Sequence, residues 1–418
     1  MKRLVLLAMC LFSLNASAQW GDWGGGGFGG FGGGGFGDFG GFGGGGGNPF
    51  GGEGSGNSGN IGDYKSTKDI DYVGDNHIGH KLDIYFPKDD KPKHNVIIHI
   101  YGSAWGSNNS KGSADLGTVG VAALQAGYIF VAPNHRTYND ALYPAQINDI
   151  KAVVRYLRGN AEELGIDTSF IAISGFSSGG HLASLMGVTR GQKVFTVGSA
   201  TMDIEGNLGK YTNESSWVDA VCDWSGPVDC RYKNCGNPIQ MAPENDMVGG
   251  CNDQQCPDKH ALLGANTFID ADDAPTMVCH GSSDNIVPQC EGKMFYDNLE
   301  KAGVECEYYP HGGGHGVAGE FTDEMIAFFQ KIRDDKASKS TQTSISTATA
   351  VAKNICLDQD KLYLCNAEAE PCNFTLADVM GRTIMHGELT ANGVNISSLS
   401  NGVYLVRTSN GDTFKFIK

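Results

Sequence analysis

Three side chains of the types that carry out acyl transfer stand far apart in this chain. Ser177 lies in GFSSG (residues 175–179), Asp284 in HGSSDNIVP (280–288) and His315 in GGGHG (312–316). A serine hydroxyl becomes a nucleophile when a histidine takes its proton and an acid holds that histidine in the right tautomer. The order serine, aspartate, histidine therefore predicts a catalytic triad assembled from three separate loops.

The residues around Ser177 predict the turn that such a serine needs. A short apolar run, Phe170 to Ile173, comes before it, and HLASLMG, which has the composition of a helix, comes after it. A serine between strand and helix sits on a turn so tight that only glycine fits two residues before and two after. An ordinary strand-to-helix turn can show the same glycines. The interpretation of Ser177 as a nucleophile therefore depends on Asp284 and His315 as well.

The acid and the base each have rivals in the sequence. Asp284 directly follows a predicted strand, although a turn-capping role is open to it, and His315 lies in a glycine-rich loop after the last predicted strand. The rivals are aspartates that lie before the strand, a histidine nearer the strand end, and two histidines better suited to packing or to a supporting place behind the catalytic residues: Asp270, Asp272, Asp273, His311, His280 and His181.

An oxyanion hole is expected after the first central strand, where the chain reads YGSAWG (101–106). Small residues there let the backbone N–H groups of Gly102 and Ser103 approach a substrate, together with that of Ser178. Ala104 replaces Ser103 if the loop is shifted by one residue. Four aromatic residues near this mouth either bind the substrate or belong to the core: Tyr101, Trp105, Phe176 and Trp224.

Strands alternating with helices predict an α/β fold with a doubly wound, mostly parallel sheet. The expected strands are 82–86, 95–101, 128–132, 171–173, 220–224, 276–280 and 304–309, and the expected helices include 145–157 and 320–331. Between residues 227 and 262 the pattern breaks into Cys, Asn, Asp and Pro, which indicates an insertion above the carboxyl ends of the strands, where ligands bind in such sheets.

Composition changes divide the chain into five parts. Lys2 and Arg3 before an apolar run and small residues predict a signal peptide over residues 1–18. Residues 19–63 are rich in glycine and predict a disordered linker, 64–335 the α/β domain, and 336–352 a second linker. Residues 353–418 show short alternating runs separated by turn residues, which favour a small β-sandwich.

Charge and cysteine content restrict the class of protein. The net charge of −16 and the pI of about 5.0 argue against nucleic acid as a partner. The equally spaced pairs Cys230/Cys235 and Cys251/Cys256 favour disulfides over zinc in an exported protein, with the connectivity left open. No cofactor and no metal are expected, since the acidic run 244–258 lacks an ordered ligand spacing. The oligomeric state is not readable.

Together, YGSAW, GFSSGGH, HGSSDNIVP and GHG resemble the esterase/lipase branch of the α/β-hydrolases over about residues 64–335. More narrowly, the chain is similar to bacterial carbohydrate esterases of the feruloyl-esterase type, which are hormone-sensitive-lipase-like. The resemblance implies Ser177 as nucleophile, Asp284 as acid and His315 as base. The sequence departs from the family at Tyr101 and Ser103, where the family has an oxyanion histidine and a second glycine, and at His135, where a tyrosine is usual.

The C-terminal part resembles the type IX secretion sorting domain, through LSNGVYLVR (399–407) and the closing FKFIK. That resemblance implies the secretion machinery as a partner and a secreted or cell-surface protein that passes through the periplasm. A carbohydrate-binding or stalk sandwich is the alternative.

The expected function is a secreted serine esterase that cleaves acetyl or feruloyl esters of plant polysaccharide. Alternatives are a lipase or polyester hydrolase, a peptidase of the prolyl-oligopeptidase branch, and a non-catalytic surface adhesin on the same fold. The peptidase branch usually carries an N-terminal propeller, for which this chain has no candidate segment.

Overall fold

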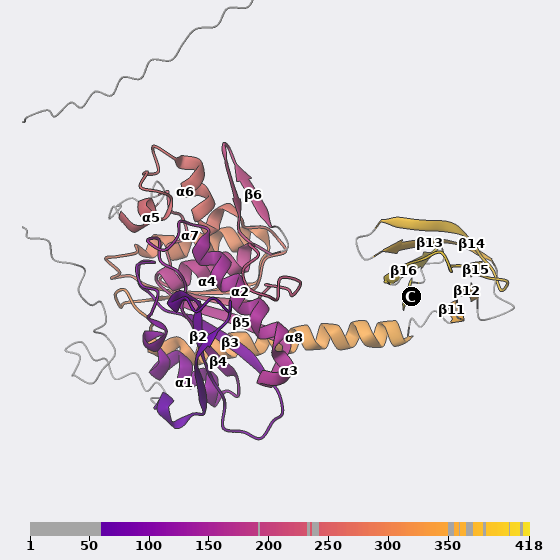
Figure 1. Cartoon of the computed structure of the whole chain (residues 1–418), viewed down its shortest axis with the longest axis horizontal. Coiled ribbons are helices and arrows are strands. Elements are labelled where there is room, and N and C mark those ends of the chain that lie inside the picture. The colour runs from indigo at the N-terminus through magenta and orange to yellow at the C-terminus, as the bar shows by residue number, and fades with distance from the viewer. Residues whose placement is uncertain are drawn as a thin grey trace, which may run out of the picture. The chain divides into compact units, whose positions relative to one another are not determined.

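The structure is a computed structural model, and it describes residues 60–190, 193–231, 235, 242–349, 355–358, 360–364, 371–378, 382–400, 402–409 and 413–418 (Figure 1). The predicted signal peptide and nearly all of the glycine-rich stretch lie outside the described residues. Within the described part, no helix is both long enough and apolar enough to span a bilayer.

An eight-stranded sheet forms the centre of the larger folded part, in the order β1-β2-β4-β3-β5-β8-β9-β10. β2 pairs antiparallel with β1 and β4, and every other pairing is parallel. The strands are β1 (Ser66–Asp71), β2 (Lys81–Tyr85), β3 (His94–Ile100), β4 (Ile129–Pro133), β5 (Ile166–Phe176), β8 (Ala220–Trp224), β9 (Thr276–Gly281) and β10 (Cys306–His311). The predicted doubly wound, mostly parallel sheet is therefore confirmed.

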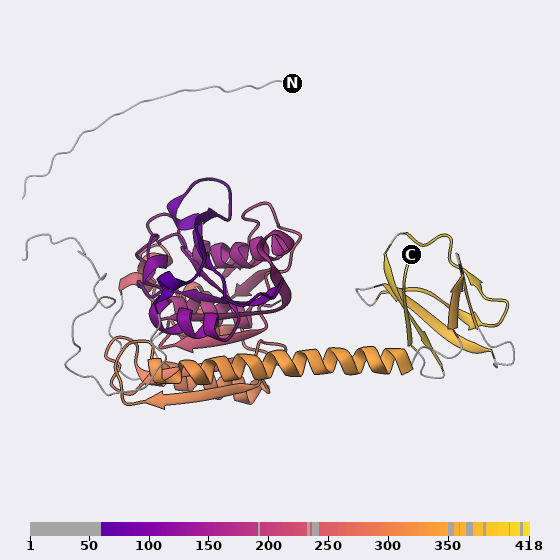
Figure 2. The ribbon, with the colours of Figure 1, turned by 90° about the horizontal axis from the view of Figure 1, so that it is seen from below.

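Helices cover both faces of this sheet, and the alternation of side chains along β3 shows why. Val96, Ile98 and Ile100 face one core with α2 (Ala145–Gly159), α4 (Ser178–Val188) and α7 (Gln289–Ala302). Ile97 faces the other core, which contains α1 (Val121–Gln125) and the first turns of α8 (Thr322–Thr349), the long orange helix of Figure 2. All of these β3 side chains are fully buried. Burial on both faces accounts for the continuous apolar run in the sequence.

Further elements join or extend these layers. They are the short helix α3 (Ala161–Leu164), the 3-10 turns η1 (Ile61–Asp63), η2 (Ile78–His80), η3 (Lys111–Ser113), η5 (Ala265–Thr267) and η6 (Gly319–Phe321), and the π-type turn η4 (Leu116–Gly120).

Two excursions leave the alternating pattern. A hairpin, β6 (Val194–Val197) and β7 (Ala200–Asp203), follows α4, and α5 (Ala242–Met247) and α6 (Pro257–Leu263) follow β8 (Figure 1). Disulfides join Cys251 to Cys256 and Cys235 to Cys290 on α7. Of the two equally spaced pairs, Cys251 and Cys256 are joined to each other, whereas Cys235 is joined to Cys290 and Cys230 is fully buried in the core with a free thiol.

The C-terminal part has two small antiparallel sheets around a core of its own. Their orders are β11-β12-β15 and β14-β13-β16-β17. The strands are β11 (Ile355–Asp358), β12 (Lys361–Leu364), β13 (Cys372–Asp378), β14 (Thr383–Leu389), β15 (Val394–Asn395), β16 (Val403–Thr408) and β17 (Thr413–Ile417). Buried side chains such as Leu362, Leu376 and Val406 alternate with exposed ones, as in the predicted sandwich.

One boundary differs from its prediction. The sequence predicts a helix over 320–331 followed by a linker from residue 336, but α8 continues to Thr349. The Ser- and Thr-rich stretch is helical because it contains no glycine or proline between residues 322 and 349, so nothing in it stops a helix already begun. The remaining domain boundaries stay predictions.

Candidate active site

Ser177 occupies the turn between β5 and α4, in a backbone conformation that few non-glycine residues adopt. Its φ is 55° and its ψ is −121°. A Cβ on Gly175 would meet the carbonyl of Gly179, and a Cβ on Gly179 would meet the carbonyl of Ile100. Both glycines are therefore required by close backbone packing, as the sequence pattern predicted, and the turn stores strain at the serine.

The Ser177 hydroxyl lies 2.9 Å from Nε2 of His315, and Nδ1 of His315 lies 2.8 Å from Oδ2 of Asp284. An ionised carboxylate can only accept, so Nδ1 carries the proton and Nε2 accepts from the hydroxyl. The Asp284 side chain is fully buried, and that of His315 is 13% exposed. The three predicted side chains thus form one continuous hydrogen-bonded chain.

The Asp284 carboxylate is held on both oxygens. Oδ1 accepts hydrogen bonds from the backbone N–H groups of Ile286 and Val287, each at 2.9 Å. Burial alone would raise the pKa of Asp284, but hydrogen bonds from His280, His315 and the Ile286 N–H outweigh it and hold that pKa below its usual range. The acid therefore stays ionised while it faces the imidazole.

Main-chain hydrogen bonds align the two loops that carry the acid and the base. We call these loops, residues 281–284 and 311–315, the acid–base rim. The Ser282 N–H donates to the His311 carbonyl at 2.7 Å, and the Ser283 N–H donates to the Gly313 carbonyl at 2.9 Å. These bonds extend the pairing of β9 and β10 past the strand ends and bring His315 over Asp284. The rival His311 instead accepts from the Gly313 N–H and lies against Phe321.

The predicted oxyanion residues lie in a second loop, residues 101–106, which we call the oxyanion loop. A Cβ on Gly102 would lie 2.7 Å from the Phe176 ring and 2.8 Å from Ser177 Cβ, so this backbone passes directly beside the nucleophile. The Ser103 N–H donates to the Ser178 hydroxyl at 2.9 Å. Ala104 and Trp105 both have positive φ. The loop is thus close to Ser177, and one of its predicted donors is engaged by a side chain.

Three of the four aromatic residues predicted at the substrate mouth are core side chains, which corrects that prediction. Tyr101 is 1% exposed and donates to the Ser107 carbonyl, and Trp105 is fully buried and donates to His181. Trp224, also fully buried, donates to the Ser174 hydroxyl. Each ring buries its apolar body and satisfies its polar atom inside the protein. The sequence could not separate this packing role from a binding role.

Phe176 differs from the other three aromatic residues. Its ring is only partly buried and lies 4.8 Å from the His315 ring. The residue stands directly before Ser177 in the chain, so it reaches the reacting groups from the elbow itself.

A histidine outside the predicted set also lies next to the acid. His280 is fully buried, and its Nε2 lies 3.4 Å from Asp284 Oδ2. Its sequence signal was its place four residues before Asp284, at the end of the preceding strand. The departure at position 135 has no comparable contact, because buried His135 stacks on Tyr101 and bonds the Arg136 carbonyl.

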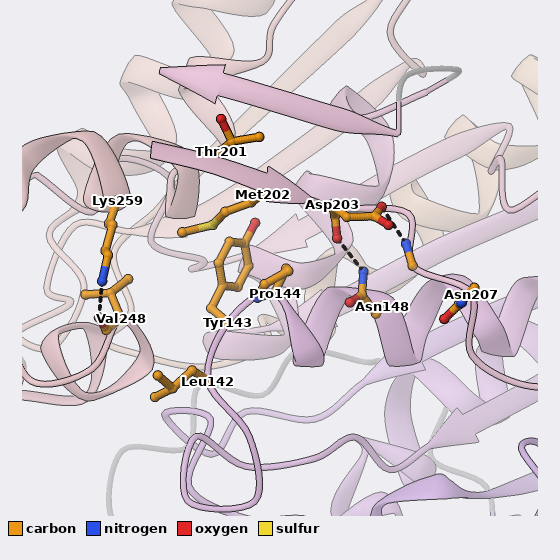
Figure 3. Close-up of a pocket in the computed structure, with 11 residues that line it drawn as sticks. Leu142, Tyr143, Pro144, Asn148, Thr201, Met202, Asp203, Asn207, Val248 and Lys259 are labelled. Atoms are coloured by element: carbon orange, nitrogen blue, oxygen red, sulfur yellow. Dashed lines mark hydrogen bonds between the residues drawn. The ribbon is translucent and has the colours of Figure 1, made fainter. Parts of the chain in front are cut away.

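A pocket of about 470 Å³ opens between the start of α2, the β7 strand and the α6 region (Figure 3). Asn148 donates to the carbonyl of Asp203 across it, and Lys259 donates to the carbonyl of Val248. None of the triad or oxyanion candidates lines this pocket. In the described part of the chain, no group of three or more His, Cys, Asp or Glu side chains is arranged to hold a metal ion.

The BD-FAE family model matches residues 82–299, and the secretion system C-terminal sorting domain matches residues 358–418. An esterase of Mycobacterium tuberculosis is 30% identical over 248 residues, covering 56% of this chain and 56% of its own. The chain spans about half the length of the curated relatives it matches, 47% and 56% for two of them.

Two solved structures are more similar in sequence. A truncated carbohydrate esterase from gut microbiota is 41% identical with a TM-score of 0.62, covering 65% of this chain and 96% of the other. A bifunctional GH43-CE protein of Bacteroides eggerthii is 44% identical with a TM-score of 0.61, covering 64% of this chain and 35% of the other.

Proposed function

Because the chain belongs to the BD-FAE family, we propose that it is a serine carboxylester hydrolase whose catalytic residues are Ser177, His315 and Asp284. One observation carries the proposal: the unbroken hydrogen-bonded chain from the Ser177 hydroxyl through His315 to the Asp284 carboxylate. The esterase relatives support the same reaction class.

In the proposed reaction, the Ser177 oxygen attacks the ester carbonyl carbon while His315 Nε2 takes the hydroxyl proton. The negative charge that develops on the carbonyl oxygen is met by backbone N–H groups of Gly102 and Ser178, and by that of Ser103 once it exchanges the Ser178 hydroxyl for the substrate. The imidazolium then donates its proton to the departing alcohol oxygen, which leaves an acyl-enzyme. Water, deprotonated by the same imidazole, releases the acid and restores Ser177.

Asp284 stabilises the imidazolium without taking its proton. Its carboxylate accepts from His315 Nδ1 and from two backbone N–H groups, which fix its orientation, and its lowered pKa keeps it charged. A charge so placed in a buried position is worth more than the same charge in water.

The proposed substrates are acetyl or feruloyl esters of plant polysaccharide. The two similar solved structures are named as a carbohydrate esterase and a bifunctional GH43-CE protein, which supports a sugar-linked ester. Phe176, beside His315, is the aromatic side chain proposed to contact the acyl or sugar group. The sorting-domain match supports a secreted or cell-surface location reached through the type IX machinery, and we keep residues 1–18 as the proposed signal peptide.

Hydrolysis of p-nitrophenyl acetate by the full chain and by Ser177→Ala tests the reaction. Loss of the nucleophile lowers kcat by about 10⁴-fold or more. Ser169→Ala is the matched control, since Ser169 is an exposed serine at the other end of the same strand, β5, and its variant keeps full activity. Ester hydrolysis that survives Ser177→Ala would overturn the proposed mechanism, and absence of any hydrolysis together with no fluorophosphonate labelling would favour the adhesin alternative.

Release of ferulate and of acetate from wheat arabinoxylan, measured side by side, tests the substrate class. We expect ferulate or acetate to be released from arabinoxylan faster than p-nitrophenol is released from p-nitrophenyl butyrate and longer p-nitrophenyl esters. Faster hydrolysis of the long-chain esters would point to a lipase instead.

A further inference from the structure

His280 lies where β9 ends and the Asp284 turn begins, with one ring nitrogen close to two acceptors. Its Nε2 is 2.9 Å from the Val287 carbonyl and 3.4 Å from Asp284 Oδ2. Both oxygens need a donor, so Nε2 carries the proton. The side chains of His280 and Asp284 are both fully buried, so water does not compete for this N–H.

Val287 links this imidazole to the acid by a second route. Its N–H donates to Asp284 Oδ1, while its carbonyl accepts from His280. The same residue is therefore held from both sides, once by the carboxylate and once by the ring. The Gln289 side chain closes the arrangement by donating to the His280 carbonyl at 3.1 Å. The turn that supplies two N–H groups to Asp284 is thus fastened at its far end by His280.

Helix α7 is shaped to admit the ring. A Cβ on Gly292 would lie 2.5 Å from His280 Nδ1 and 3.1 Å from its Cβ and Cγ, so the helix backbone packs directly on the imidazole. Nδ1 itself is buried and has no hydrogen-bond partner among the described residues. Leaving a buried polar atom unpaired costs free energy. The stabilising hydrogen bonds of this ring are therefore those of Nε2. If the ring served for packing alone, an apolar ring of similar size would fill the same space without the free-energy cost of an unpaired Nδ1.

The titratable groups around the ring come from four elements. They are Asp284 on its own loop, Asp223 on β8, Glu291 on α7 and His311 on β10. Burial works to lower the pKa of His280, but the hydrogen bonds to Asp284 and Val287 and the charge of Asp223 raise it overall. The ring therefore lies in an acidic surrounding that favours an N–H facing Asp284.

We propose that His280 is a positioning residue for the esterase reaction: its Nε2–H holds the Val287 carbonyl and the Asp284 carboxylate so that Asp284 stays aligned with His315. The inference rests on the proposed function, since it assigns Asp284 the role of acid. His280 touches neither substrate nor the reacting atoms and acts through Asp284. Without it, the turn 284–287 relaxes and the imidazolium formed in the transition state is less stabilised, while substrate binding is unaffected.

Three substitutions separate this role from packing. In His280→Gln the side-chain amide reaches the place of Nε2 and still donates, whereas in His280→Asn it reaches only the place of Nδ1. In His280→Leu no donor remains. For p-nitrophenyl acetate, the His280→Leu and His280→Asn variants each have a kcat about 30-fold below that of the parent, with KM changed by less than about 2-fold. The kcat of His280→Gln stays within about 3-fold of the parent value. The acid limb of kcat/KM moves to lower pH in the Leu and Asn variants.

His260→Gln is the matched control. His260 is fully buried on α6, and its two ring nitrogens bond the carbonyls of Cys230 and Cys251. Among the described residues it makes no hydrogen bond to Ser177, His315 or Asp284. This variant loses stability but keeps the parent pH profile. If His280→Leu does not fold, the contrast between Gln and Asn decides, with each variant's folding checked by its thermal unfolding.

Two outcomes overturn the inference. The first is an unchanged kcat and acid limb in His280→Leu or His280→Asn; the second is an equal loss in Gln and Asn with the parent pH profile, which marks packing alone. Neither can be confused with failure of the proposed function, because that failure shows in the parent protein, as an absence of hydrolysis that depends on Ser177.

Discussion

The acid–base rim and the oxyanion loop lie at the same edge of the sheet but are fastened by different means. On the acid–base rim, backbone N–H groups of Ser282 and Ser283 bond the carbonyls of the opposite loop. The oxyanion loop is fastened to α4 by side chains, through Ser103 to Ser178 and Trp105 to His181. Main-chain bonds survive most substitutions, whereas a side-chain bond is lost with one residue. The two halves of the site should therefore respond differently to mutation.

The largest expected effect comes from changing chemistry on the acid–base rim while keeping its geometry. Asp284→Asn retains the acceptor for the backbone N–H groups but removes the charge and favours the wrong tautomer of His315. We expect kcat for p-nitrophenyl acetate to fall by about 10⁴-fold with little change in thermal unfolding. A fall of less than about 10-fold would mean that the rim does not supply the acid.

An intermediate effect is expected where the oxyanion loop passes the nucleophile. Gly102→Ala places a Cβ within 2.8 Å of Ser177 Cβ and against the Phe176 ring, which in turn lies on His315. We expect kcat to fall by about 100-fold, the loss typical of one displaced oxyanion donor. Gly112→Ala, where nothing lies within 4 Å of the added methyl group, is the control and keeps full activity. Equal activity in the two variants would remove Gly102 from the proposed hole.

The smallest effect sharpens the contrast between the two kinds of fastening. Ser178→Ala removes the acceptor of the Ser103 N–H, and we expect the free energy of unfolding to fall by about 1 kcal/mol and kcat by about 5-fold. Ser282→Ala removes an exposed hydroxyl but leaves its backbone bond, so both quantities stay at the parent value. Urea unfolding and steady-state kinetics measure these two quantities for both variants. Equal changes in Ser178→Ala and Ser282→Ala would refute the distinction between side-chain and main-chain fastening.

Much of this arrangement could be predicted from the sequence because it depends on short-range patterns. The alternation of apolar runs with helical segments predicts the layers, and the glycines around Ser177 predict the turn. The burial of Trp105 and Trp224 is harder to predict, since a large aromatic residue near a strand end has the same local sequence whether it faces a cavity or the core. Their burial follows from partners distant in the chain, His181 and Ser174. The role of His280 also depends on distant packing, because Gly292 makes room for its ring.

The Cys235–Cys290 disulfide has a consequence for how the protein is made. It closes a loop of 55 residues between the insertion and α7, the helix that packs on His280. In a chain-entropy account, such a closure disfavours the unfolded chain by on the order of 4 kcal/mol. Recombinant material from a reducing cytoplasm would lack this cross-link, so oxidative refolding or export to a bacterial periplasm is the suitable route to crystals and kinetics.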